Sequence, residues 1–169
     1  MDIIASEPLL ASPSGICWDE RGRMFVSELH GYNLAGQLDI EELNKTGKLD
    51  TQVRRVQADA KFKKAADAGT FGVVKMLSNT DGDGRMDRRT TFVDGLILPR
   101  AMALYRDGVL VAEPPQLWYY RDRDGDGKAD LRKRILHGLD SADTHHTSNS
   151  FVTDGGGAIY FQEGTVHHT

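Results

Sequence analysis

The chain has 169 residues, the size of one domain, and a formal net charge of −4, which gives no reason to expect a nucleic-acid partner. A single cysteine, Cys17, excludes an internal disulfide and any Cys-x-x-Cys-His haem attachment within the chain. No stretch approaches the length of a membrane-spanning helix, and no signal peptide is visible at its start.

Three segments share a pattern that is typical of a β-hairpin. Each has a short apolar run, a turn with Asp and Gly, a second apolar run and then a glutamate. Glycine supplies the positive φ that such turns need, so we expect a hairpin in each segment. Because repeats also repeat their scaffolding, the shared glutamate can be purely structural. The segments are residues 15–28, 101–113 and 150–163, and their glutamates are Glu28, Glu113 and Glu163.

An insertion, roughly residues 29–70, follows the first hairpin. Alanine and lysine are frequent over residues 58–68, which predicts a helix that ends at Gly69. Before the first hairpin, residues 2–5 favour an outer strand that belongs to another repeat.

A nine-residue pattern of acidic residues and glycine occurs twice, at residues 79–87 and 122–130. Oxygen-bearing side chains stand at positions 1, 3, 5 and 9 and glycine at position 6, the spacing of an EF-hand-type calcium loop. The backbone carbonyl of position 7 would add a neutral ligand. The candidate metal ligands are Asn79, Asp81, Asp83, Arg85 and Asp87 in the first loop, and Asp122, Asp124, Asp126, Lys128 and Asp130 in the second.

The alternative is a solvated Asp/Gly turn without a metal, but two copies in the same register favour Ca²⁺. Position 12, usually a bidentate glutamate, is Thr90 in one copy and Lys133 in the other. We therefore expect sites that are weak, or that a water or a distant residue completes. Short β-branched and aromatic runs flank both loops, so we expect them to connect β-strands rather than two helices.

The two acidic loops lie 43 residues apart in the sequence, from Asn79 to Asp122. A period in the forties that is made of strands predicts propeller blades. The fold class expected is all-β, a partial β-propeller of about two and a half four-stranded blades with one helical insertion. The first blade covers residues 14–96, the second 100–139, and a half blade 145–169. Because propellers close with about four to eight blades, we expect a piece of a larger propeller; the alternative is a ring of several chains.

Four of the six histidines fall in the last 25 residues, as two His-His-Thr triplets that bracket the third hairpin. If that hairpin forms, both triplets emerge at one end of it, close to Glu163. Clustered imidazoles beside a carboxylate can bind a transition metal or act as a general base on a hydroxyl substrate. The alternative is that they are inert surface residues. The candidate base is His145 or His146, and the candidate substrate-binding residues are His30, Arg100, Glu163, His167 and His168.

Several motifs together resemble one family over nearly the whole chain. They are Ser27-Glu-Leu-His-Gly-Tyr-Asn33, the two Asp-Gly-Asp-Gly loops, Val111-Ala-Glu-Pro-Pro115, Asp143-Thr-His-His-Thr147 and Tyr160-Phe-Gln-Glu-Gly-Thr165. They resemble the N-terminal propeller of the membrane-bound dehydrogenase-like proteins of planctomycetes and verrucomicrobia. That propeller has six or seven blades and is distantly similar to soluble quinoprotein glucose and sorbosone dehydrogenases.

The resemblance implies an exported or periplasmic oxidoreductase that acts on a sugar or an alcohol. It also implies pyrroloquinoline quinone as a cofactor, with a histidine in the place of His145 or His146 as the base. A c-type haem domain outside this chain would accept the electrons. The alternative function is a non-catalytic propeller module that binds carbohydrate or protein, with purely structural calcium.

Overall fold

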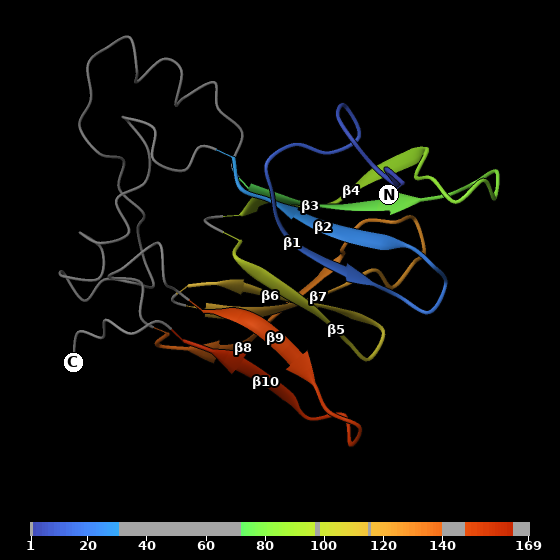
Figure 1. Cartoon of the computed structure of the whole chain (residues 1–169). Helices are drawn as coiled ribbons and strands as arrows, with labels where there is room; N and C mark the ends of the chain where they lie inside the picture. The colour runs from blue at the N-terminus through green and yellow to red at the C-terminus, as the bar shows by residue number, and fades with distance from the viewer. Residues whose placement is uncertain (1, 31–71, 97–98, 115, 140–147, 164–169) are drawn as a thin grey trace, which may run out of the picture.

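The computed structural model describes residues 2–30, 72–96, 99–114, 116–139 and 148–163 (Figure 1). All regular elements in these ranges are β-strands. The first sheet contains β1 (Pro13–Trp18), β2 (Met24–Glu28), β3 (Gly72–Ser78) and β4 (Arg88–Leu96); the second contains β5 (Ala101–Tyr105), β6 (Gly108–Glu113), β7 (Gln116–Arg121) and β8 (Leu131–His137); and β9 (Asn149–Thr153) pairs with β10 (Ile159–Gln162).

Within each sheet, every strand pairs antiparallel with the strand that follows it in the chain, so each four-stranded sheet is a meander. The predicted all-β class is confirmed, and the three predicted hairpins form as β1–β2, β5–β6 and β9–β10. The predicted helix at 58–68 and most of the insertion lie outside the described residues. Within the described part of the chain, no helix is long and apolar enough to cross a membrane.

The meanders give the molecule two distinct ends. The turns within the three hairpins (β1–β2, β5–β6 and β9–β10) and both acidic loops lie at one end, called the loop end, on the right in Figure 1. The β6–β7 turn and the strand ends that enter or leave the other connections lie at the opposite end, called the connection end.

Neighbouring sheets meet at their first strands. β1 lies against β5, and β5 lies against β9. The two strands run close together at Gly15, where a Cβ atom would stand 3.5 Å from the Cα of Ala101, an ordinary contact, and 3.0 Å from the Ser27 Oγ of its own sheet. The Ser14 hydroxyl donates to the Pro99 carbonyl over 2.6 Å and ties the same two sheets together.

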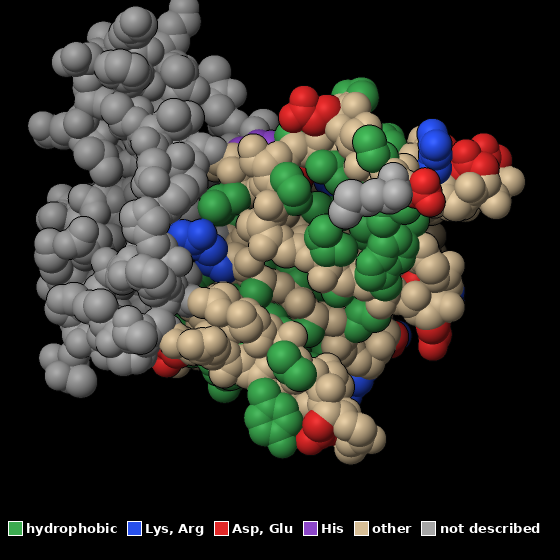
Figure 2. All heavy atoms as spheres, in the orientation of Figure 1, with side chains coloured by type: hydrophobic (Ala, Val, Ile, Leu, Met, Phe, Trp, Pro, Cys, Tyr) green, Lys and Arg blue, Asp and Glu red, His purple; other side chains and the backbone are tan. Residues whose placement is uncertain are grey.

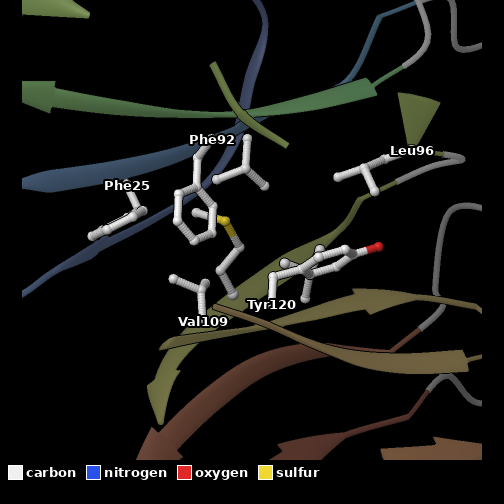
Figure 3. Close-up of a cluster of buried hydrophobic side chains, with 8 residues drawn as sticks. Phe25, Phe92, Leu96, Val109 and Tyr120 are labelled. Atoms are coloured by element: carbon white, nitrogen blue, oxygen red, sulfur yellow. The ribbon is translucent and has the colours of Figure 1, made fainter. Parts of the chain in front are cut away.

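A hydrophobic cluster fills the space between the first and second sheets. Figure 3 shows Phe25, Phe92 and Leu96 from one sheet facing Val109 and Tyr120 from the other. The Phe25 and Phe92 rings meet edge to face, with centroids 5.2 Å apart. This contact explains why aromatic and branched residues are frequent in these strands.

Strand β2 is buried on both faces, and its sequence therefore does not alternate. Phe25 faces the second sheet, whereas Met24 and Val26 pack against Leu9 and Leu10 of the N-terminal segment. The outermost strand β8 is mostly exposed, in keeping with its polar sequence.

The N-terminal segment does not form the outer strand predicted at residues 2–5. One backbone hydrogen bond is present, from the Met86 amide to the Ile4 carbonyl at 2.7 Å, and the segment otherwise runs as a loop over the first sheet. A single bond without a ladder does not make a strand.

Some apolar side chains stay open to solvent. Figure 2 shows hydrophobic side chains over the face that carries the N-terminal segment, and others at the β9–β10 hairpin. Ile3 is 69% exposed, and the cross-strand partners Val152 and Tyr160 are 62% and 60% exposed.

Candidate metal site and the two ends of the sheets

The two acidic loops connect β3 to β4 and β7 to β8, as the flanking sequences predict. They fold alike, because in each loop side-chain oxygens at positions 1, 3 and 5 accept hydrogen bonds from backbone amides two or three residues later. The bonds are Gly82 to Asn79 (2.7 Å), Asp83 to Asp81 (3.1 Å) and Arg85 to Asp83 (2.7 Å) in the first loop, and Gly125 to Asp122 (2.6 Å), Asp126 to Asp124 (3.2 Å) and Lys128 to Asp126 (2.7 Å) in the second.

The second loop brings three carboxylates together. One oxygen from each of Asp122, Asp124 and Asp126 lies within 4.8 Å of the other two. Calcium binds oxygen at about 2.3–2.6 Å, so two ligands on opposite sides of one ion are roughly 5 Å apart. The carboxylates therefore fit the coordination sphere of a Ca²⁺ ion in spacing and in chemistry.

Asp122 is the best-connected of the three. Partial burial acts to raise the pKa of its carboxyl, but hydrogen bonds from the Gly127 and Gly125 amides outweigh burial, with help from Asp124 and the charge of Arg23. The net effect lowers the pKa of Asp122, so this carboxylate is ionised at neutral pH, as a calcium ligand must be.

The first loop has the same backbone with a weaker donor set. Asn79 stands where the second loop has Asp122, which leaves two carboxylates, Asp81 and Asp83, at positions 3 and 5. With one negative charge fewer, this loop should bind a divalent cation less tightly.

The position 9 aspartates are not part of the carboxylate group. Asp130 accepts hydrogen bonds from the backbone amide and the Nε of Arg123, both at 3.0 Å. Asp87 accepts from the amide and hydroxyl of Thr80, and the hydroxyl bond is the main reason that the pKa of Asp87 is lowered. Through these bonds the two aspartates brace the base of each loop. Position 9 of EF-hand loops often reaches the metal only through a water, so a direct bond from these residues is not required.

The structure also explains the missing glutamate at position 12. Thr90 already lies within β4, paired with Met76, and Lys133 lies within β8, paired with Tyr119. Once the strand has begun, the chain runs away from the loop and cannot fold back over it.

Each loop is bonded to the structure that precedes it in the sequence. The Ala129 amide donates to the carbonyl of Phe92 in the first sheet over 2.7 Å, and the Met86 amide donates to that of Ile4 over 2.7 Å. Gly127 has a φ of 87°, and a Cβ there would stand 3.0 Å from the Met76 Cε. The second loop therefore fills the seam between the two sheets, a role that the sequence does not reveal.

At the connection end, Glu28 is fully buried. Its Oε1 accepts from Lys75 Nζ at 2.7 Å and from the Ala11 amide at 2.8 Å, and its Oε2 lies 2.7 Å from the Nε2 of His30. A buried carboxylate needs such partners to offset the loss of hydration. The equivalent Glu113 is also buried and lies 3.5 Å from Arg132.

His30 follows β2, Arg100 precedes β5 and Glu163 follows β10, so these predicted substrate-binding residues lie at the connection end, opposite the acidic loops. Arg100 donates its backbone amide to Ala112 over 3.0 Å. Sequence reasoning missed Lys75 as the partner of Glu28, for which no signal exists in the sequence. The candidate base His145 or His146 and the candidates His167 and His168 lie outside the described residues.

Cys17 lies in β1 against the core between the sheets. Burial, with a smaller contribution from the charge of Asp19, raises the pKa of its thiol to about 12. The thiol is therefore protonated at neutral pH, as expected of a cysteine that packs against a core rather than acting as a nucleophile.

The chain is therefore an all-β protein of consecutive antiparallel meanders, and each four-stranded meander carries one acidic loop. The chain belongs to a protein family described as Domain of unknown function (DUF7133), whose sequence model matches residues 1–169. No curated protein and no solved structure matches the chain.

Proposed function

We propose that the protein is a calcium-binding segment of a β-propeller, in which a cation in each acidic loop fastens one blade to the structure before it. Two features support the propeller: the four-stranded meanders follow each other in the sequence, and their first strands lie side by side. Strands that line a common axis are the arrangement that a propeller requires.

The observation that carries the calcium proposal is the carboxylate group of Asp122, Asp124 and Asp126 within a loop that is hydrogen-bonded across the sheet seam. Three like charges this close repel each other and favour opening of the loop. A bound Ca²⁺ would reverse that effect and hold the loop against Phe92. The carbonyl of Lys128 is the expected fourth ligand, and Asp81 and Asp83 with Asn79 would hold a second, weaker ion.

The test is calorimetric titration of the chelator-treated protein with CaCl₂, followed by thermal unfolding in CaCl₂, in MgCl₂ and in EDTA. We expect binding heat and a higher melting temperature with calcium, because a ligand that binds only the folded state stabilises it. An unchanged melting curve together with no binding heat would overturn the proposal.

An oxidoreductase of sugars or alcohols is the second candidate function. The observation that favours it is the position of His30, Arg100 and Glu163 at one end of the sheets, with His30 held by the buried Glu28. A carboxylate behind an imidazole fixes the orientation of the ring, which suits His30 to binding a substrate hydroxyl group, while the candidate base is His145 or His146. The quinone, the haem-bearing acceptor domain and the exported or periplasmic location stay predictions from resemblance.

Turnover of sugars and alcohols with an artificial electron acceptor, after addition of pyrroloquinoline quinone, tests this second function. Activity that a His145→Ala/His146→Ala double variant loses would support it. No turnover, with glycan binding retained, would instead favour a non-catalytic module that binds carbohydrate.

A further inference from the structure

A cleft of about 500 Å³ opens at the loop end, between the first and second sheets. Binding sites for small molecules commonly have volumes of about 300–1,000 Å³. The β1–β2 turn, the β5–β6 turn and the second acidic loop form its rim, and Phe25, Phe92, Leu104 and Val109 lie beneath them. This cleft lies at the opposite end of the sheets from the predicted substrate-binding residues His30, Arg100 and Glu163.

Charged groups dominate the rim and balance one another. Five guanidinium groups and five carboxylates line the cleft: Arg21, Arg23, Arg106, Arg121 and Arg123, with Asp19, Glu20, Asp107, Asp122 and Asp124. These charges cancel, so one bound Ca²⁺ would leave an excess of one positive charge when its third carboxylate, Asp126, is counted as well. The cleft would then attract an anion.

Arg106 and Arg121 can each donate to a ligand in the cleft. Arg121 pairs with Asp107 through one Nη at 2.6 Å, but 42% of its side chain is exposed, so part of its guanidinium is open to solvent. Arg106 forms no ion pair in the described part of the chain, and its guanidinium lies over the ring of Tyr105, 5.1 Å from the centroid. Arg106 also has a φ of 53°, a conformation that costs energy for a non-glycine residue and is frequent at binding sites.

The acidic loop contributes its candidate metal ligands to the cleft wall, since Asp122 and Asp124 both line it. Ca²⁺ takes six to eight oxygens, whereas the loop supplies three carboxylates and one expected carbonyl. Asp130 is turned to Arg123, and no position 12 glutamate closes the sphere. The remaining coordination positions need oxygens from elsewhere.

We propose that this cleft binds a small hydroxy acid, such as a sugar acid, in a calcium-dependent manner. The ligand's carboxylate and a neighbouring hydroxyl complete the coordination of the ion, and Arg106 and Arg121 pair with its negative charge. Guanidinium groups suit this role because they bind carboxylates through paired N–H donors. The inference rests on the proposed calcium site of the second loop.

The experiment is a calorimetric titration of the protein in two steps, first with CaCl₂ and then with D-galacturonate. We expect galacturonate to bind in calcium, to lose binding at least tenfold in EDTA, and to bind at least tenfold more tightly than neutral galactose. Arg106→Gln and Arg121→Gln should each weaken galacturonate at least fivefold without changing calcium affinity. Arg88→Gln, which changes an exposed arginine outside the cleft, should leave galacturonate affinity unchanged.

The outcomes separate the two proposals. Calcium binding without galacturonate binding would overturn the hydroxy-acid site and leave the calcium site standing. Equal affinity for galactose, or for inorganic phosphate, would also overturn it, since either result removes the combined need for a carboxylate and a hydroxyl. Absence of calcium binding would overturn both proposals together.

Discussion

The two acidic loops differ at position 1, which is Asn79 in the first loop and Asp122 in the second, so each residue can be replaced by the other. Asp122→Asn gives the second loop the donor set of the first, and Asn79→Asp makes the opposite change. We predict that Asp122→Asn removes about half or more of the calcium-dependent stabilisation, whereas Asn79→Asp increases it. The two variants change the charge by one unit in opposite directions at equivalent places, so each serves as the control for the other.

Without calcium the Asp122→Asn variant should be about as stable as the wild type. Two unit charges 4.8 Å apart repel by about 0.9 kcal/mol in water. Removing the Asp122 charge relieves two of the three repulsions, a gain of roughly 1.7 kcal/mol. The amide nitrogen cannot accept the Gly127 hydrogen bond seen at 2.8 Å, a loss of about 1 kcal/mol. The net change is below about 1 kcal/mol.

With calcium the two proteins should differ. At a calcium concentration a hundredfold above Kd, the wild type gains about 2.7 kcal/mol, or roughly 5–11 °C in Tm for a chain of this size. Loss of one charged ligand should raise Kd by about 10- to 100-fold, which cuts the gain to roughly 1.4 or 0.4 kcal/mol at the same concentration.

Differential scanning calorimetry in CaCl₂, MgCl₂ and EDTA measures these gains for the wild type and both variants. The refuting result is a calcium-induced shift in Tm that is the same in all three proteins. In that case the stabilising ion does not bind at position 1 of either loop.

Three further predictions follow from contacts described above. Gly127→Ala should destabilise the protein more than its control Gly125→Ala. Both glycines have a positive φ (87° and 82°), in which alanine costs about 1–2 kcal/mol, but only at position 127 would the added Cβ meet a neighbour, Met76. Equal unfolding free energies of the two variants in urea would show that the second loop does not pack on the first sheet. Glu28→Gln should cost about 3–5 kcal/mol in urea unfolding, because it breaks a buried ion pair; a cost below about 1 kcal/mol would mean that the pair is not formed. The Cys17 thiol, with its pKa raised from 9.0 to about 12, should be alkylated at pH 8 about a thousandfold more slowly in the folded protein than in urea, and similar rates in both states would contradict its burial. The contribution of the protonated thiol to stability should be intact below pH 9 and should fall as the pH rises toward 12, whereas Cys17→Ala should lack this pH dependence.

The strands could be predicted from the sequence because their signals are local. Alternating apolar residues with a glycine-containing turn mark each hairpin, and the spacing of Asn79–Asp87 and Asp122–Asp130 marks the loops without any knowledge of the fold. The convergence of Asp122, Asp124 and Asp126 follows from the same local spacing, so it too was within reach.

What could not be predicted depends on contacts between distant segments. Nothing in the sequence links Lys75 to Glu28 across 47 positions, or Phe92 to Ala129. The strand predicted at residues 2–5 was wrong because this segment makes one backbone bond, from Met86 to Ile4, rather than a ladder, and Ile3 and Ile4 stay exposed. The arginines of the cleft come from turns that are remote in sequence, and only the fold assembles them.

The hydrogen bonds of the acidic loops give the molecule a direction. Each loop bonds to a carbonyl that lies closer to the N-terminus, Ile4 for Met86 and Phe92 for Ala129. During synthesis on the ribosome, each loop therefore finds its hydrogen-bond partner already made. Calcium available at that moment would fix every finished repeat in turn, so the chain would be assembled one repeat at a time in the order of translation.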